Sequence, residues 1–271
     1  MTRFFKLSGA GNDFIALAQP DREPRADEIR AWCRRRLSVG ADGLFVLRRV
    51  PGRRPRRVDM QYFNSDGLEA DLCLNATRCA ARLAIHLQWA KARLAIGTSV
   101  GVLQAEILDE TRVAVKAPLP ALEPERRVVD GAESAFEGWS VTIGVPHFVV
   151  LAQGPLAEID VECCAPPIRG HAVFGNEGTN VNFVTFHEAN RMSIRSYERG
   201  IEAETPACGT GILAAVSVGV ETGQLTLPAT VHTQGGFDFE VAGEMRSGAI
   251  VSWSLIGDAR LVASGTIHSP C

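Results

Sequence analysis

Two cysteines lie where helices are expected to begin, and each is followed by small or apolar residues. Cys208 precedes Gly-Thr-Gly in the stretch ACGTGILAAV, and Cys73 precedes LNATRCAARLAIH. Free backbone N–H groups and the helix dipole at an N-terminus lower the pKa of a thiol and attract carboxylates, and glycines let a ligand approach closely. Either cysteine alone could equally be a buried, unreactive thiol. Together they predict a site for acid–base chemistry.

Two opposed thiols of this kind can invert a stereocentre that carries an acidic proton. A thiolate removes the proton from one face of the carbon, and a thiol on the other face returns one. The helix N-termini would hold the substrate carboxylate and stabilise the charge that develops on it. Such a reaction needs no cofactor, and we expect none.

The rest of the composition disfavours other chemistries. Only three lysines occur, none in a Gly- or Ser-rich phosphate-binding context, which disfavours a pyridoxal enzyme. The six histidines are scattered and no Cys-x-x-Cys occurs, which disfavours a metal site. A formal net charge of −3 provides no basic surface, so we expect no nucleic-acid partner.

The cysteine count and the lack of targeting signals predict a cytoplasmic protein. Seven cysteines, an odd number, in a chain of 271 residues without a signal peptide favour reduced thiols. No stretch approaches the roughly 18 continuous apolar residues that a membrane span needs, so we expect no membrane association.

The elements that would position the two thiols are helices of one kind. The segments Leu72–Ala90 and Ala207–Gly223 are apolar around most of their circumference, which is typical of buried helices. Each is followed by runs that alternate apolar and polar residues between glycine-containing turns, as antiparallel strands do. The sequence therefore predicts an α+β protein of two similar domains, each an antiparallel, barrel-like sheet wrapped around a central hydrophobic helix.

The Pro-rich segment Lys116–Val128 is the predicted boundary between the halves. We assign residues 1–116 and 261–271 to the N-terminal half, which carries Cys73, and residues 117–260 to the C-terminal half, which carries Cys208.

Two further segments have a recognisable pattern. An amphipathic surface helix is expected over Pro24–Ser38, with an apolar face made of Ile29, Trp32, Cys33 and Leu37. The basic run Arg48–Arg57 is expected to be a solvated loop.

Five stretches of the chain resemble motifs of the diaminopimelate epimerase family, whose members are cofactor-independent amino-acid racemases and epimerases. They are FFKLSGAGNDF (Phe4–Phe14), VGADGL (Val39–Leu44), YFNSDGLEADLCLNATRC (Tyr62–Cys79), GTNVNFV (Gly178–Val184) and YERGIEAETPACGTG (Tyr197–Gly211). The last is highly specific, because Glu-Arg-Gly and Ala-Cys-Gly-Thr-Gly stand at a fixed spacing. The resemblance covers most of the chain and implies the family's fold, an isomerase activity and a homodimer.

The resemblance also implies roles for individual residues. Cys73 and Cys208 would be the two acid/base thiols, assisted by His147 and Glu198. The side chains that would bind the amino and carboxylate groups of the substrate are Asn12, Asn64, Asn180 and Arg199. The backbone N–H groups that would hold the carboxylate at the reacting centre are those of Leu74, Asn75, Gly209 and Thr210. The cysteines without a motif role are expected to be packing residues: Cys79, Cys163, Cys164 and Cys271.

Two departures from the family pattern bear on the substrate. Leu74 and Ala76 stand where the family has glycines, so a backbone that needed a positive φ would be strained there. Val145 stands where the family has an asparagine that helps to bind the far end of the substrate. Three functions remain open: interconversion of LL- and meso-diaminopimelate, racemisation of another amino acid such as histidine, and amino-acid binding without catalysis.

Overall fold

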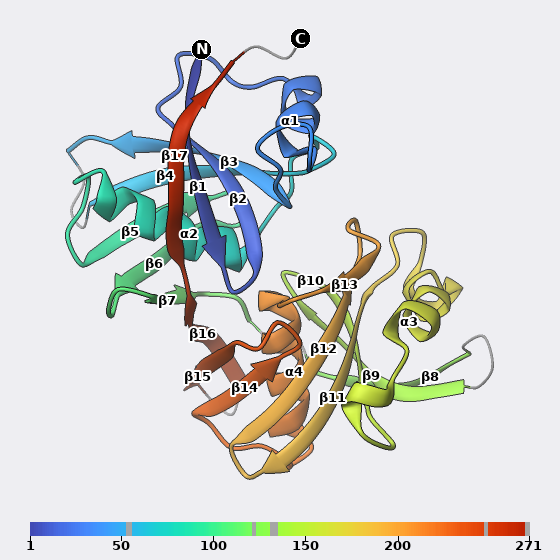
Figure 1. The fold of residues 1–271 in the computed structure, drawn as a ribbon. Coiled ribbons are helices and arrows are strands. Elements are labelled where there is room, and N and C mark those ends of the chain that lie inside the picture. The colour runs from blue at the N-terminus through green and yellow to red at the C-terminus, as the bar shows by residue number, and fades with distance from the viewer. Residues whose placement is uncertain (53–55, 121–122, 131–134, 247–248, 269–271) are drawn as a thin grey trace. The chain divides into compact units, whose positions relative to one another are not determined.

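The chain divides into two compact units in a computed structural model that describes residues 1–52, 56–120, 123–130, 135–246 and 249–268 (Figure 1). The N-terminal unit comprises Met1–Ala117 and Ile256–Cys271, and the C-terminal unit comprises Pro118–Leu255. The chain enters the second unit within the Pro-rich segment and returns inside strand β16 (Ala249–Asp258). Cys271, expected to be a packing thiol, lies outside the described residues.

The N-terminal unit is a mixed sheet with helices α1 (Ala26–Cys33) and α2 (Leu74–His86). Its strands are β1 (Thr2–Gly9), β2 (Asn12–Ala18), β3 (Gly43–Val50), β4 (Arg57–Asn64), β5 (Arg93–Thr98), β6 (Gly101–Ile107), β7 (Arg112–Ala117) and β17 (Arg260–Ile267). Hydrogen bonds pair them in the order β17-β1-β2-β3-β4-β5-β6-β7. Helix α2 packs against strands from across this sheet, so it is the central helix of the unit.

The C-terminal unit is built in the same way around helix α4 (Gly209–Glu221), with helix α3 (Val161–Arg169) and the short 3₁₀ helices η1 (Leu156–Glu158) and η2 (Ala172–Phe174). Its strands, besides β16, are β8 (Glu125–Asp130), β9 (Ala135–Ile143), β10 (Val145–Leu151), β11 (Asn180–Glu188), β12 (Arg191–Glu198), β13 (Ala203–Thr205), β14 (Ala229–Thr233) and β15 (Asp238–Arg246). They pair in the order β8-β9-β10-β11-β12-β14-β15, and β13 also pairs with β12.

The two units share one pairing pattern. Along β1-β2-β3-β4-β5-β6 and along β9-β10-β11-β12-β14-β15, the successive pairs are antiparallel, parallel, antiparallel, parallel and antiparallel. Each parallel crossover contains a helix, as parallel pairing requires a long connection: α1 and α2 in the first unit, α3 and α4 in the second. The α+β architecture of two similar halves is thus confirmed, and the crossovers add parallel pairs to the antiparallel ones that the alternation predicted.

Each central helix begins directly after its cysteine, two residues inside the predicted segment, and ends before that segment does. Every residue of Gly209–Gly219 is buried, which explains why this helix is apolar on all sides. Cys73 and Cys208 have extended backbones and are the N-cap residues. Gln88 and Gly223 adopt left-handed conformations, with φ of 59° and 71°, and these turn the chain away just after each helix.

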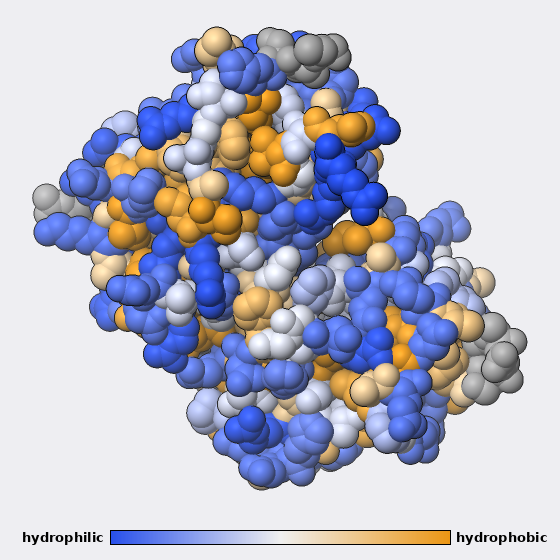
Figure 2. Space-filling model, in the orientation of Figure 1, coloured by the Kyte–Doolittle hydropathy of each residue, from blue (hydrophilic) through white to orange (hydrophobic). Residues whose placement is uncertain are grey.

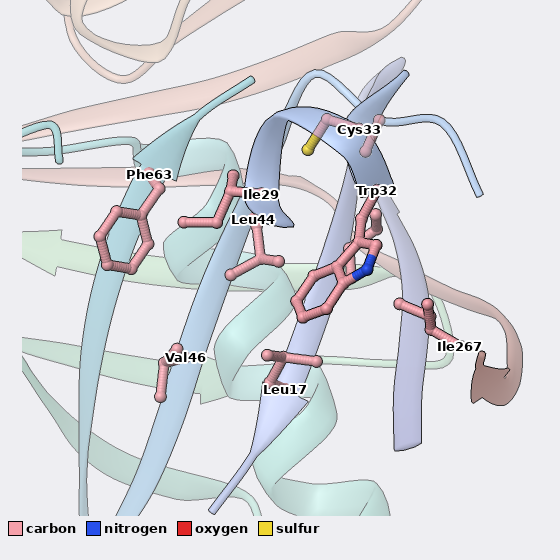
Figure 3. Packing of buried hydrophobic residues seen from close by; sticks show 10 residues of the cluster. Leu17, Ile29, Trp32, Cys33, Leu44, Val46, Phe63 and Ile267 are labelled. Carbon is pink, nitrogen blue, oxygen red and sulfur yellow. The ribbon is translucent and has the colours of Figure 1, made fainter. Parts of the chain in front are cut away.

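Helix α1 covers one apolar cluster of the N-terminal unit but is shorter than expected. Ile29, Trp32 and Cys33 pack against Leu17, Leu44 and neighbouring residues of the cluster, so the packing role of Cys33 is confirmed (Figure 3). The helix ends at Cys33, because the extended backbone of Arg34 leads into a turn that directs Arg35 to carboxylates of the sheet. Leu37 is therefore 72% exposed, and its place on the apolar face was predicted wrongly.

The basic run is also more ordered than expected. Arg48 lies in β3, where its guanidinium pairs with Glu23, and Arg57 begins β4, where it pairs with Asp59. Only residues between these strands form the connection, and 53–55 lie outside the described residues.

The face drawn in Figure 2 is mostly polar, with apolar residues scattered between charged ones. Exposed large apolar side chains include Leu68, Val128 and Val262. Within the described residues, no helix has the length and apolar character needed to cross a membrane.

Candidate active site

Cys73 begins α2 in the N-terminal unit, and its thiol is partly exposed. The Sγ atom accepts a hydrogen bond from Ala76 N–H at 3.4 Å, and Thr77 Oγ1 donates to the Cys73 carbonyl at 2.9 Å. Leu74 and Ala76 have helical backbones with negative φ. The strain considered for these two positions therefore does not arise, and their side chains are simply buried in the first turn.

A buried chain of amides runs from α2 to β2. The Arg78 guanidinium donates to Asn75 Oδ1 at 2.6 Å, and Asn75 Nδ2 donates to Asn12 Oδ1 at 2.6 Å. Arg78 is completely buried, which lowers its pKa to about 10, and a negative charge on Cys73 would interact favourably with it. Two residues expected to touch the substrate, Asn12 and Asn75, are thus held by a cation behind the first turn of the helix.

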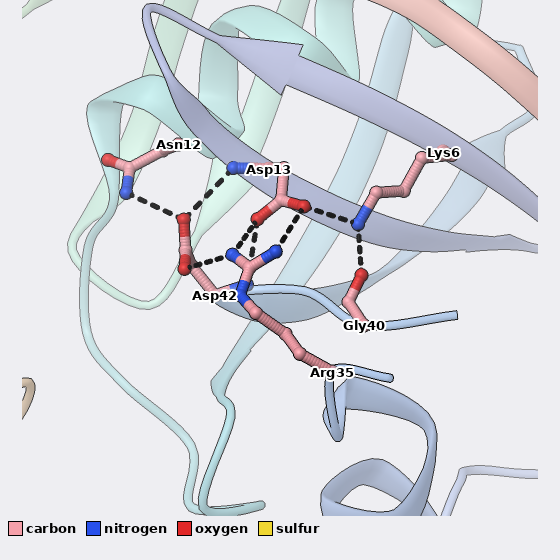
Figure 4. A network of polar contacts seen from close by, with 6 residues as sticks. All are labelled: Lys6, Asn12, Asp13, Arg35, Gly40 and Asp42. Carbon is pink, nitrogen blue, oxygen red and sulfur yellow. Dashed lines mark hydrogen bonds and ion pairs between the residues drawn. The ribbon is translucent and has the colours of Figure 1, made fainter. Parts of the chain in front are cut away.

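From Asn12 the hydrogen bonds continue to four charged side chains beside strands β2 and β3 (Figure 4), namely Lys6, Asp13, Arg35 and Asp42. Asn12 Nδ2 donates to Asp42 Oδ2 at 3.2 Å, and Arg35 bridges Asp42 and Asp13. Lys6 lies 2.6 Å from Asp13. Burial tends to raise the pKa of Asp13, but Arg35 and Lys6 outweigh it and hold the pKa below its usual value. This group fixes the orientation of the Asn12 amide.

Asn64 lies at the end of β4 opposite Gly43 and is not linked by a described hydrogen bond to Asn12 or Asn75. Its backbone N–H donates to Leu68 O, and its carbonyl accepts from Gly67 N–H, both at 2.9 Å. The backbone of Asn64 therefore closes a turn.

Cys208 begins α4 in the C-terminal unit and is only 4% exposed. Burial raises the pKa of the Cys208 thiol well above its usual value, and the charge of Glu198 and its hydrogen bond to the thiol raise it further. The Gly211 N–H and the Thr210 hydroxyl, 3.7 Å from Sγ, oppose this only in part. The sequence predicted a lowered pKa here. That prediction was wrong, because desolvation outweighs the helix N-terminus.

Glu198 lies beside this thiol at the end of β12. Its Oε1 accepts a hydrogen bond from Thr205 Oγ1 at 2.5 Å, which orients the carboxylate. A carboxylate in contact with a neutral thiol can receive or return its proton. Cys208 and Glu198 thus form a pair suited to proton transfer.

His147 lies in β10 and is 1% exposed. Its Nδ1 is 3.1 Å from Asn182 Nδ2, and its Nε2 is buried without a partner among the described residues. Burial, assisted by the charge of Arg199, lowers the pKa of His147 to about 3. The ring is therefore neutral at physiological pH.

The side chain of Asn180 is hydrogen-bonded to the backbone of Arg199. Asn180 Oδ1 accepts from Arg199 N–H at 2.9 Å, and Asn180 Nδ2 donates to Pro146 O at 3.0 Å. The Arg199 guanidinium binds Glu177 at 2.9 Å. Asn180 thus ties the start of β10, which holds Val145 and His147, to the residue after β12.

Two residues near these groups were not assigned from the sequence. They are Arg78, which lies in the apolar segment that the sequence predicts as a buried helix, and Asn182, which lies in the GTNVNFV motif. Asn182 could have been found from strand alternation, since residues two apart in β11 face the same side as Asn180. The reach of Arg78 to Asn75 could not, because it depends on the burial of the helix.

The remaining cysteines differ in their surroundings. Cys79 is fully buried, as expected of a packing residue. Cys164 is half-buried against an apolar cluster. Cys163 is exposed, so its expected packing role is wrong, because it faces outward from α3. Within the described residues, no three His, Cys, Asp or Glu side chains are grouped as metal ligands.

The fold is one that solved racemase- and epimerase-like proteins share. A probable proline racemase from Agrobacterium radiobacter superposes with a TM-score of 0.73 at 12% identity, over 100% of this chain and 94% of that one. A hydroxyproline epimerase from Agrobacterium vitis superposes with a TM-score of 0.71 at 12% identity, over 98% and 90%. At this identity the likeness concerns the fold alone.

Sequence comparison defines the family. The family described as diaminopimelate epimerase matches residues 4–118 and 139–260. The diaminopimelate epimerase of Aquifex aeolicus is 35% identical over 246 residues, which cover 86% of this chain and 87% of that protein. The diaminopimelate epimerase of Gemmatimonas aurantiaca is 34% identical over an alignment of 282 positions, which covers 97% of this chain and 98% of that protein. The chain belongs to the diaminopimelate epimerase family.

Proposed function

We propose that the protein is a cofactor-independent isomerase that interconverts LL- and meso-diaminopimelate. Family membership supports the reaction. The structural observation that carries it is that each central helix begins at a cysteine whose surroundings can stabilise one protonation state.

In the proposed reaction, the two thiols act on opposite faces of one α-carbon. Cys208 keeps its proton, because burial and Glu198 favour the neutral thiol, and it supplies a proton to the carbanion. Cys73, whose negative form the charge of Arg78 attracts, removes the α-proton. The protonation states are then exchanged, and the reverse reaction starts from that state.

The developing negative charge needs donors at the substrate carboxylate. The first-turn N–H groups of a helix have no intrahelical acceptor. Those of Leu74 and Asn75 in α2 and of Gly209 and Thr210 in α4 are the proposed donors, with each pair buried at the start of its helix.

Recognition of the far end of the substrate is proposed to rest on Arg199, Asn180 and Asn64. The amide of Asn180 already bonds to backbone atoms, so its role would be to orient Arg199. The apolar Val145 at the start of β10 favours a second candidate, a racemase for an amino acid with a less polar far end. Glu177, paired with Arg199, is an acceptor that an ammonium group could use instead.

Hydrogen exchange at the α-carbon separates these candidates. The reduced enzyme is incubated in deuterated water with LL-diaminopimelate and, separately, with single monocarboxylic amino acids including histidine. We expect deuterium incorporation and formation of the meso isomer only with diaminopimelate. Exchange only with a monocarboxylic amino acid would establish the second candidate. Binding without exchange for every amino acid would indicate a non-catalytic protein.

We also infer a cytoplasmic homodimer from the family resemblance and from the cysteines of the described residues, which form no disulfide with one another. Sedimentation equilibrium in reductant should give twice the mass of the 29.2 kDa chain. A monomer at all concentrations would contradict the dimer without affecting the proposed reaction.

A further inference from the structure

A buried polar chain crosses three strands of the C-terminal unit and reaches His147. Ser196 Oγ on β12 donates to Asn182 Oδ1 on β11 at 2.8 Å, and Asn182 Nδ2 lies 3.1 Å from His147 Nδ1 on β10. All three side chains are at most 3% exposed. Buried polar groups are costly unless their hydrogen bonds are satisfied, so this chain has a defined arrangement.

The orientation of the Asn182 amide follows from its neighbour α4. A Cβ added at Gly211 would lie 2.4 Å from Asn182 Oδ1, so this amide end lies against the first turn of the helix. That turn carries N–H groups without intrahelical acceptors and a partial positive charge. An amide oxygen is stabilised there and an amide NH₂ is not. The NH₂ group of Asn182 must therefore point to His147.

This orientation decides which ring nitrogen of His147 carries the proton. An NH₂ group is only a donor, so Nδ1 must accept and must be unprotonated. The ring is neutral, so its one proton is on Nε2. Nε2 is buried without a partner among the described residues, which leaves an N–H group free for a substrate or a thiolate.

Resting on the proposed function, we propose that Asn182 is a positioning residue that holds His147 as the Nε2–H tautomer, so that the ring donates a hydrogen bond at the reacting centre and does not remove a proton. Ser196 and the N-terminus of α4 keep Asn182 in place. The charge of Arg199 acts on the ring. Three more charged residues, Glu123, Glu125 and Arg127, line a cavity of about 290 Å³ that His147 also lines.

The tautomer can be measured without any substrate. Nitrogen-15 spectra of the labelled, reduced protein at neutral pH distinguish protonated from unprotonated ring nitrogens, and the His147 signals are identified by their absence in His147→Gln. We expect an unprotonated Nδ1 and a protonated Nε2. A proton on Nδ1, or an imidazolium at neutral pH, would overturn the proposal. Because this spectrum needs no turnover, it tests Asn182 even if the proposed reaction proves wrong.

Variants of Asn182 test the consequence for activity. In Asn182→Asp the carboxylate must accept from Nδ1–H, which moves the proton and favours imidazolium. We expect kcat to fall about 10²-fold with little change in KM, and the Nδ1 signal to become that of a protonated nitrogen. Ser196→Ala is the milder change, since it removes only the hydrogen bond to Asn182 Oδ1. We expect kcat to fall about tenfold in this variant.

Thr185→Val is the matched control. Thr185 lies on the same strand, and its Oγ1 is buried without a partner among the described residues, so removing it should leave kcat and the ring spectrum unchanged. Wild-type kcat in both Asn182→Asp and Ser196→Ala would refute the positioning role. A loss of the same size in Thr185→Val would show that any polar change on this strand has the effect.

Discussion

Cys73 and Cys208 begin equivalent helices but lie in opposite electrostatic surroundings. The buried guanidinium of Arg78 attracts negative charge at Cys73, whereas burial and the carboxylate of Glu198 favour the neutral thiol at Cys208. At its start, a proton-transfer cycle needs one thiol that acts as a base and one that acts as an acid, and these two surroundings suit Cys73 and Cys208 to those roles.

Replacing either thiol by a hydroxyl should therefore nearly abolish turnover. A serine hydroxyl is far less acidic than a thiol, so we expect kcat in Cys73→Ser and in Cys208→Ser to fall at least about 10²- to 10⁴-fold. The value of kcat is measured by separating the stereoisomers of the preferred amino acid by chiral chromatography during the reaction. Cys163→Ser is the control, because Cys163 is exposed. Near-normal activity in either active-site variant would disprove the two-thiol mechanism.

The burial of His147 has a consequence for stability against acid. The pKa of His147 is about 3 in the folded protein, against 6.5 for an unburied histidine. Between these pH values the unfolded chain therefore binds a proton that the folded chain does not. Stability from this group is complete above pH 6.5 and is lost as pH falls from 6.5 towards 3, by up to about 5 kcal/mol. Urea unfolding of wild type and His147→Gln between pH 7 and 4 should show the wild type losing more stability. Parallel pH profiles would mean that the pKa of the ring is the same in the folded and the unfolded chain.

At the scale of elements, Asn182 on strand β11 packs against the first turn of α4 and leaves no room for a side chain at Gly211. Gly211 leaves room for Asn182 Oδ1, and its added Cβ would also lie 3.2 Å from Cys208 Sγ. Alanine favours a helix over glycine by about 1 kcal/mol, but here a β-carbon must displace a buried amide.

Gly211→Ala should consequently be destabilising and inactive. We expect a loss of about 1–3 kcal/mol in the free energy of unfolding and a fall in kcat, because Asn182 and the thiol must both shift. Gly154→Ala is the control, since no atom lies within 4 Å of its added Cβ. If Gly211→Ala raised the stability instead, the helix would have room that the structure does not show.

At the scale of the whole molecule, one pairing pattern occurs twice, and each copy begins its central helix at a thiol. Two copies of one supersecondary arrangement can supply two similar acid–base groups to one reaction. The proposal that both serve one substrate does not depend on either half alone, so its test must involve both cysteines.

Oxidation provides that test. Two thiols that serve opposite faces of one carbon should form a disulfide when a mild oxidant is added without substrate. We expect activity to be lost, restored by reductant and protected by substrate, and peptide mapping to find Cys73 joined to Cys208. Cys33 and Cys79 are buried packing residues and should stay reduced. Activity that is indifferent to oxidant and reductant would contradict a shared site.

Much of the fold was predictable because it depends on local pattern. The long apolar segments and the alternating runs between turns specify two buried helices and their sheets. The end of α1 was not predictable, because Arg35 lies beyond the helix and binds Asp42, seven residues later, together with Asp13 on strand β2, and only the fold brings these two carboxylates together. The parallel pairs were likewise missed, since alternation does not reveal strand direction.

The amino-acid sequence by itself determined where both central helices begin, that each begins at a cysteine, and the family to which the motifs point. These features are local, and a few consecutive residues specify them. Only the tertiary structure decided that Cys208 is a neutral thiol, that Leu74 and Ala76 are unstrained, and that Asn182 orients His147. A pKa or a tautomer depends on burial and on partners brought from other strands, and these exist only once the chain has folded.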